Sequence, residues 1–119
     1  MAFTGTPVLK KVSDKMYRIT GVSLAGDASG TIGFDDKTSA AEVSIPAPTW
    51  QPYKTAGGNS VSLQDAVKVS INPVTDVTTP VPISVVKSGT THADFAITLH
   101  NDTAATTGPE MEIYVQFHD

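Results

Sequence analysis

The sequence predicts an all-β fold, a β-sandwich or jelly-roll-like domain of about seven to nine short, mainly antiparallel strands with at most one short helical turn. Three observations lead to this prediction. Apolar and polar residues alternate in several short runs, which is the period of a half-buried strand. Turn signals rich in Gly, Pro, Asn, Asp and Ser separate these runs. No stretch has the length and period of a helix that could connect parallel strands.

The most regular alternation lies at residues 110–118. The apolar residues Met111, Ile113, Val115 and Phe117 occupy every second position, with Glu, Tyr, Gln and His between and around them. A strand places these two sets on opposite faces, whereas a helix would scatter both. Because burying each apolar side chain is favourable by roughly 1.5–3 kcal/mol, we expect this strand to be docked in a sheet.

The other expected strands are shorter or less regular. In the segment 15–24, Tyr17 and Ile19 share one face and Val22 and Leu24 the other, and the Gly21 between them indicates a bulge or bend. A strand at 81–85 follows Pro80 and contains Pro82, and prolines cannot donate to a ladder, so we expect it at a sheet edge. The remaining expected strands are 8–12, 31–34, 43–45, 67–71 and 93–100.

The connections differ in stiffness. Three prolines stiffen the segment 46–53, which carries the single Trp50 close to Tyr53. This loop fits either a rigid contact with a partner or a lid over the protein's own core. The Gly-rich segment 54–60 reads as an exposed loop, because the Gly-Lys-Ser or Gly-Lys-Thr continuation of a phosphate-binding loop is absent. Residues 62–66 can form a single helical turn capped by Ser62.

The chain is expected to form one domain. Residues 1–7 are small and mostly polar and end in Pro7, so we expect an N-terminal arm, with a single β-sandwich domain over residues 8–119. The arm is either a partly disordered terminus or a segment that becomes ordered on a neighbouring subunit, with Phe3 as its anchor.

Composition argues against several classes of partner. The net charge is −4 with a pI near 5.1, and the eight cations look scattered, which disfavours nucleic acid and anionic membranes as partners. The absence of cysteine excludes disulfides and thiol catalysis. The sequence shows neither a membrane-spanning run nor a signal peptide, so we expect synthesis and folding in the cytoplasm of the cell that produces it.

Signals for chemistry are weak. His92 with Asp94, and His100 with Asp102, are spaced two residues apart and can share a strand face, but two ligands do not make a metal site. A Ser–His–Asp triad is a spatial arrangement that sequence cannot exclude, yet no Gly-x-Ser-x-Gly elbow is present. We therefore expect a protein that is not an enzyme, with no catalytic residues, no metal site and no cofactor.

Segments 1–8, 61–69, 88–95 and 111–118 together resemble small proteins encoded among the head genes of tailed bacteriophages, the capsid decoration or cement proteins. This resemblance implies a β-sandwich or jelly roll on the outside of an icosahedral head, commonly a trimer, that binds the major capsid protein and stabilises the shell. It implies a virion protein located on the outer capsid surface, with no nucleic acid or membrane as partner. Candidate contact residues, chosen for aromatic or rigid character, are Phe3, Pro7, Trp50, Pro52 and Tyr53.

Two other functions fit the same sequence. The first is a carbohydrate- or receptor-binding β-sandwich module of a phage tail or bacterial surface, in which Trp50 and Tyr53 would stack on a sugar. The second is another virion part, such as a tail-tube or head–tail joining subunit. Quenching of the single tryptophan by a glycan would favour the carbohydrate-binding function over the capsid function.

Overall fold

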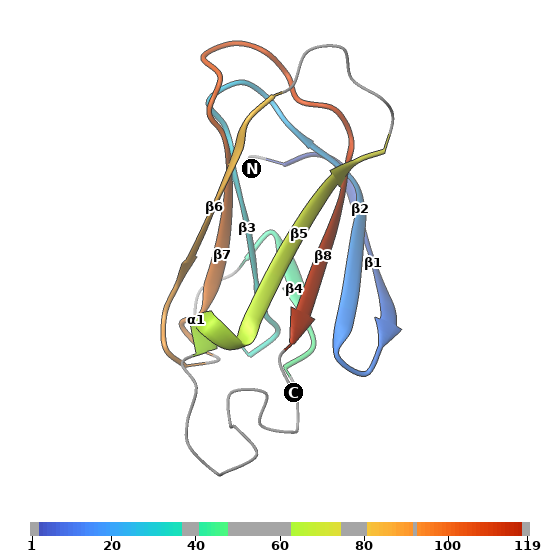
Figure 1. The fold of residues 1–119 in the computed structure, drawn as a ribbon, viewed down its shortest axis with the longest axis vertical. Helices are drawn as coiled ribbons and strands as arrows, with labels where there is room; N and C mark the ends of the chain where they lie inside the picture. Colours follow the sequence, from blue (N-terminus) through green and yellow to red (C-terminus); the bar gives the residue numbers. More distant parts are fainter. Residues whose placement is uncertain (1–2, 37–40, 48–62, 75–80, 92, 118–119) are drawn as a thin grey trace.

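The computed structural model describes residues 3–36, 41–47, 63–74, 81–91 and 93–117, and these form a sandwich of two four-stranded sheets (Figure 1). Sheet A has the order β1 (Phe3–Ser13), β2 (Met16–Leu24), β8 (Met111–Phe117), β5 (Val67–Pro73). Sheet B has the order β4 (Val43–Ile45), β3 (Ser29–Phe34), β7 (Ala96–Asn101), β6 (Ile83–Ser88). The predicted all-β sandwich is confirmed, and α1 (Leu63–Ala66) is the one helical turn of the described residues.

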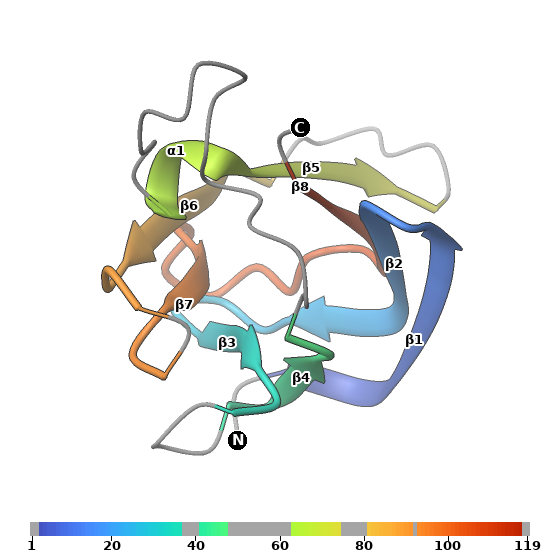
Figure 2. The same ribbon diagram turned by 90° about the horizontal axis from the view of Figure 1, so that it is seen from below.

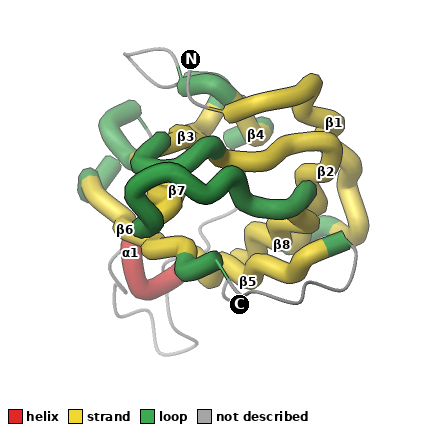
Figure 3. The backbone as a smooth tube through the Cα atoms, turned by 90° about the horizontal axis from the view of Figure 1, so that it is seen from above, coloured by secondary structure: helices red, strands yellow, loops and turns green. Residues whose placement is uncertain are grey.

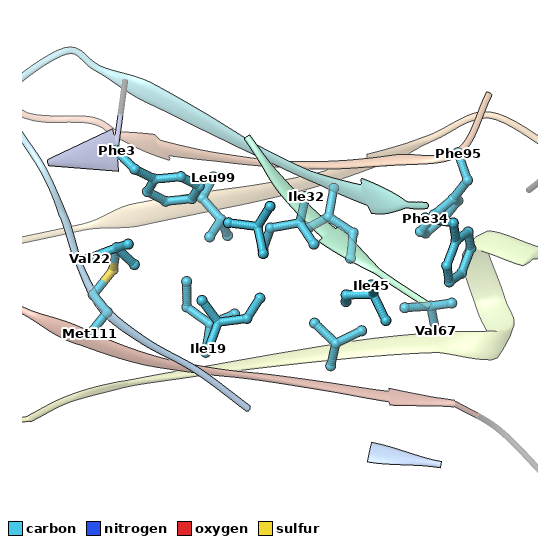
Figure 4. Packing of buried hydrophobic residues seen from close by; sticks show 14 of the residues in the cluster. Phe3, Ile19, Val22, Ile32, Phe34, Ile45, Val67, Phe95, Leu99 and Met111 are labelled. Carbon is cyan, nitrogen blue, oxygen red and sulfur yellow. The ribbon is translucent and has the colours of Figure 1, made fainter. Parts of the chain in front are cut away.

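The two sheets face each other, as the view along the strands shows (Figure 2), and the buried apolar side chains of the core lie between them. The predicted apolar face of β8 is buried throughout, from Met111 to Phe117, because β8 lies between β2 and β5. Ile32, Ile97 and Leu99 of sheet B oppose it with at most 1% of their surface exposed. Phe34 and Phe95 stack at one end of this core and Phe3 lies at the other (Figure 4).

The change of apolar phase in β2 is resolved by a bulge at Gly21, as predicted. In the pairing of β2 with β8, the register shifts between Ile19 and Val22 of β2. In the pairing of β2 with β1, it shifts between Gly5 and Val8 of β1. Gly21 has φ +83°, and a Cβ there would lie 2.5 Å from the Thr6 carbonyl oxygen, so no other residue fits without strain. The bulge turns Ile19 and Val22 to the same side, and both are fully buried.

Residues 3–7 do not form an arm, which corrects the expected boundary at residue 8. They continue β1 along β2, with Phe3 opposite Leu24, and Phe3 is only 5% exposed. Its ring lies where a Cβ on Gly30 would be, and its backbone N–H donates to Glu42 Oε1 at 3.1 Å. Because Gly30 has no side chain, the ring of Phe3 fits into the core of the same chain.

Other strand boundaries also differ from the sequence expectation, and two of these differences lie next to prolines. Strand β5 continues through Asn72 and Pro73, where a break was expected, because a proline at the end of an edge strand leaves no ladder bond unsatisfied. Strand β6 begins at Ile83 rather than residue 81, and it lies at the sheet edge as predicted.

Asn101 fixes the upper end of the sandwich. Its side chain is fully buried, and Nδ2 donates to the carbonyls of Leu24 and Thr106 at 3.0 and 2.9 Å. Its Oδ1 accepts from the backbone and hydroxyl of Thr103 at 3.0 and 2.6 Å. The loops that follow β2 and β7 are thereby held together across this end (Figure 3).

Candidate interaction surface

The candidate contact residues do not form one site in the described structure. Phe3 is a core residue and is not available to a partner. Pro7 is exposed in the bulged part of edge strand β1, where the missing N–H of a proline is tolerated. Trp50, Pro52 and Tyr53 lie outside the described residues.

The cations of the chain are not scattered, contrary to expectation. Four of the eight, Lys10, Lys11, Lys15 and Arg18, lie within the β1–β2 hairpin, together with the single carboxylate Asp14. The hairpin residues 8–18 therefore carry +3, and since the whole chain carries −4, the remaining residues carry −7. This charge separation makes one end of sheet A attractive to an acidic surface.

The strand register places two of these four cations, Lys10 and Arg18, on the side of sheet A that faces away from the core. Lys10 pairs with Arg18, Arg18 with Tyr114, and Tyr114 with Ser70, so these side chains form one row across four strands. A second row joins Met16, Gln116 and Lys68. We call the outward residues Val8, Lys10, Met16, Arg18, Lys68 and Tyr114 the basic face.

Most of the charge on the basic face is not neutralised within the described part of the chain. Glu112 is the carboxylate on this side of sheet A, and its Oε1 is 3.9 Å from the nearest Arg18 nitrogen. That distance is beyond a hydrogen bond. Lys10 and Lys68 are exposed and make no ion pair with any described residue. Val8, 55% exposed, adds an apolar contact beside them.

A second polar cluster lies on the outward side of sheet B. Ser29, His100 and Ser84 are cross-strand neighbours on β3, β7 and β6. Ser29 Oγ is 2.6 Å from His100 Nδ1, and Asp27 Oδ1 is 3.3 Å from His100 Nε2. In the neutral tautomer protonated at Nε2, His100 donates to Asp27 and accepts from the Ser29 hydroxyl.

This cluster has the residue types of a Ser–His–Asp triad, but three described backbone N–H groups beside His100 are not free to bind an oxyanion. The backbone N–H groups of Asp27, Asn101 and Asp102 beside His100 are already donated to the carbonyls of Asn101, Ala28 and Pro82. A hydrolase needs free N–H groups aimed at the developing oxyanion. The cluster is therefore better described as a polar tie between the two loops at this end of the sandwich.

Sequence reasoning found only part of each surface. It paired His100 with Asp102 by spacing, and Asp102 Oδ1 is 3.9 Å from His100 Nε2, while Asp102 Oδ2 accepts from the Ser84 hydroxyl. It missed Ser29, which is 71 residues away from His100, because only the β3–β7 pairing joins them. The basic face had a local signal, four cations within nine residues, that a count along the chain would have detected.

Comparison with known proteins returned no matching family model, no matching curated protein and no matching solved structure. No group of His, Asp and Glu among the described residues is arranged to hold a metal ion. None of the described helices is long and apolar enough to cross a membrane.

Proposed function

We propose that this chain is a capsid decoration or cement protein that binds the outside of an icosahedral phage head through its basic face. It acts without catalysis, by bridging neighbouring subunits of the major capsid protein. The resemblance of four segments to phage head proteins is the ground for the capsid as partner. The observation that carries the docking surface is the strand register that places Lys10, Arg18 and Lys68 together on the outward side of sheet A in a chain of net charge −4.

The basic face has the properties of a surface that recognises protein rather than nucleic acid. Its cations are interspersed with Val8, Met16 and Tyr114, which add apolar and aromatic contact area. Arg18 can bind a carboxylate in a bidentate geometry, while Lys10 and Lys68 act as flexible point charges. Complementary charge accelerates encounter and sets orientation, and its effect weakens with added salt.

Shell stabilisation then follows from mass action. A protein that binds the expanded shell but not the disassembled or unexpanded state stabilises the expanded state in proportion to RT ln(1 + [L]/Kd). Because an icosahedral shell repeats the same site many times, modest affinity at each site produces a large total effect. A stiff sandwich suits this role, since little conformational entropy is lost when it docks.

Charge reversal on the basic face tests the proposal. The double variant Lys10→Glu/Arg18→Glu should lose at least about tenfold in affinity for expanded shells of the virus that carries the gene, measured by cosedimentation over a salt series. The matched control Lys37→Glu/Lys54→Glu makes the same change in net charge at residues outside the hairpin sequence and should bind like the wild type.

The possible outcomes separate the candidate functions. Equal loss of binding in both double variants would refute a specific basic face, because only net charge would matter. A wild-type protein that ignores shells would refute the capsid function itself. If that protein instead shows glycan-dependent quenching of its single tryptophan, the carbohydrate-binding function replaces it.

A further inference from the structure

The two sheets expose edges of very different character. Edge strand β1 of sheet A carries several features that block pairing with another chain. It contains Pro7, it shifts register at Gly5–Val8 and again at Lys11–Ser13, and it presents Lys10 and Lys11. Prolines, bulges and lysines are the devices by which native edge strands avoid association.

Edge strand β6 of sheet B has almost none of these features. It pairs with β7 over six consecutive positions without a register shift, and it contains no glycine or proline. Val85 and Val86 are 40% and 59% exposed. Among the described elements, no strand pairs with the outer side of β6, and α1 lies against its C-terminal end, where Gln64 Nε2 donates to the Gly89 carbonyl at 3.0 Å (Figure 1). Before that end, every second residue of β6 directs its backbone N–H and C=O away from the sheet.

The single charge of β6 does not protect the edge either. The Lys87 ammonium donates to the carbonyls of Gln64 and Val67, the latter at 2.8 Å, and so ties β6 to α1 and β5. These bonds direct the Lys87 ammonium toward sheet A of the same chain. The free edge is left with Ile83, Ser84, Val85 and Val86, a segment of high β-propensity.

We propose that β6 pairs antiparallel with β6 of a second copy of this chain, which joins the two B sheets into one continuous sheet across a two-fold axis. A two-fold axis places the core-facing residues of one copy beside the core-facing residues of the other, with one residue opposite its own copy. Because Val85 and Val86 are the two central residues of β6, the strands overlap most when one of them is the residue that opposes its own copy. Neither register places Lys87 against Lys87. The strand is thus compatible with itself in both shape and charge, whereas two copies of β1 would bring lysines together.

This inference does not depend on the proposed capsid function, and it differs from what the resemblance implies. Decoration proteins are commonly trimers, but a strand cannot pair antiparallel with its own copy about a three-fold axis. The β6 contact therefore predicts pairs of chains, and the measured mass of the free protein distinguishes the two arrangements.

Site-specific cross-linking tests the contact directly, because the wild-type chain contains no cysteine. Val85→Cys, Val86→Cys and the control Val12→Cys each introduce one thiol, and Val12 is an exposed valine of comparable accessibility on β1. Directly opposed residues lie about 4.5–5.5 Å apart at Cα, within disulfide range. The alternative register separates the same two residues by about 8 Å, which is too far.

We expect one of the two β6 variants to form a disulfide dimer at least about tenfold faster than Val12→Cys under mild oxidation. In light scattering over a concentration series, the wild type should approach twice the chain mass of 12.5 kDa. The double variant Val85→Lys/Val86→Lys should remain at the single-chain mass, while the control Val8→Lys/Val12→Lys should behave like the wild type.

Several results would overturn the proposal. A wild-type mass of one chain at all concentrations, or of strictly three chains, excludes the two-fold contact. So does association that survives in Val85→Lys/Val86→Lys. If that variant fails to fold, the cysteine variants still decide, because cross-linking of both at the rate of Val12→Cys excludes pairing through β6.

Discussion

Replacement of Asn101 by alanine should destabilise the protein strongly, although the residue lies in neither proposed contact surface. The side chain is fully buried and makes four hydrogen bonds, two to carbonyls and two from Thr103. Each bond contributes about 0.5–1.5 kcal/mol net. The Leu24 and Thr106 carbonyls keep other donors, Gly108 N at 2.8 Å and Thr103 Oγ1 at 2.9 Å, so we expect a loss near the lower half of the summed range, about 2–4 kcal/mol.

The assay is urea unfolding followed by far-UV circular dichroism, with Asn72→Ala as the matched control. Asn72 is exposed at the end of β5, so its replacement should change the free energy of unfolding by less than about 0.5 kcal/mol. Asn101→Asp keeps the shape and both bonds from Thr103 but turns a carboxylate toward two carbonyls, and it should be at least as destabilising as alanine at neutral pH. If Asn101→Asp matched the wild type, the donor role of Asn101 would be refuted.

Three further predictions follow from the fold. Phe3→Ala should destabilise the isolated protein by about 3 kcal/mol or more in urea unfolding because Phe3 is buried, whereas a partner anchor would leave the isolated protein unchanged. Gly21→Ala should cost about 2 kcal/mol or more in the same assay, while Gly108→Ala, whose Cβ would make contacts no closer than 3.4 Å, should be tolerated; equal losses would contradict the bulge. The pKa of Asp94 is lowered chiefly by the hydrogen bond from the Thr91 backbone N–H, so its stabilisation is present above the ordinary value of 3.8 and is lost as pH falls through the lowered pKa. Asp94→Asn should therefore show a shallower fall in Tm than the wild type as the pH is lowered below 3.8, and parallel profiles would refute this role.

The strands could be predicted from sequence because alternation reports which face is buried. In β8 the apolar residues at every second position are the buried ones, and in β7 the same holds for Ile97 and Leu99, with the polar Asn101 as the third buried position. The bulge at Gly21 was also predictable, since the apolar phase changes at a glycine. Both signals are local, and local patterns decide the conformation of a strand more than they decide its neighbours.

The features that were predicted wrongly or missed depend on contacts between segments that are distant in sequence. Phe3 looked like a free anchor because its neighbours are small and polar, and nothing near it in sequence shows that Gly30 leaves room for its ring. The Ser29–His100 contact exists only because β3 pairs with β7, and strand order is not encoded in alternation. The rows of the basic face likewise depend on β2 lying next to β8, which the sequence does not indicate.

The two surfaces proposed for contact are compatible because they lie on different sheets. The basic face is the outward side of sheet A, and strand β6 is an edge of sheet B, so pairing through β6 leaves Lys10, Arg18 and Lys68 exposed in both copies. Two copies joined in this way would present two basic faces to one partner surface. A second site on the same assembly raises the effective concentration of the first. Loss of β6 pairing should then weaken binding to a repeating acidic surface more than binding to a single acidic protein.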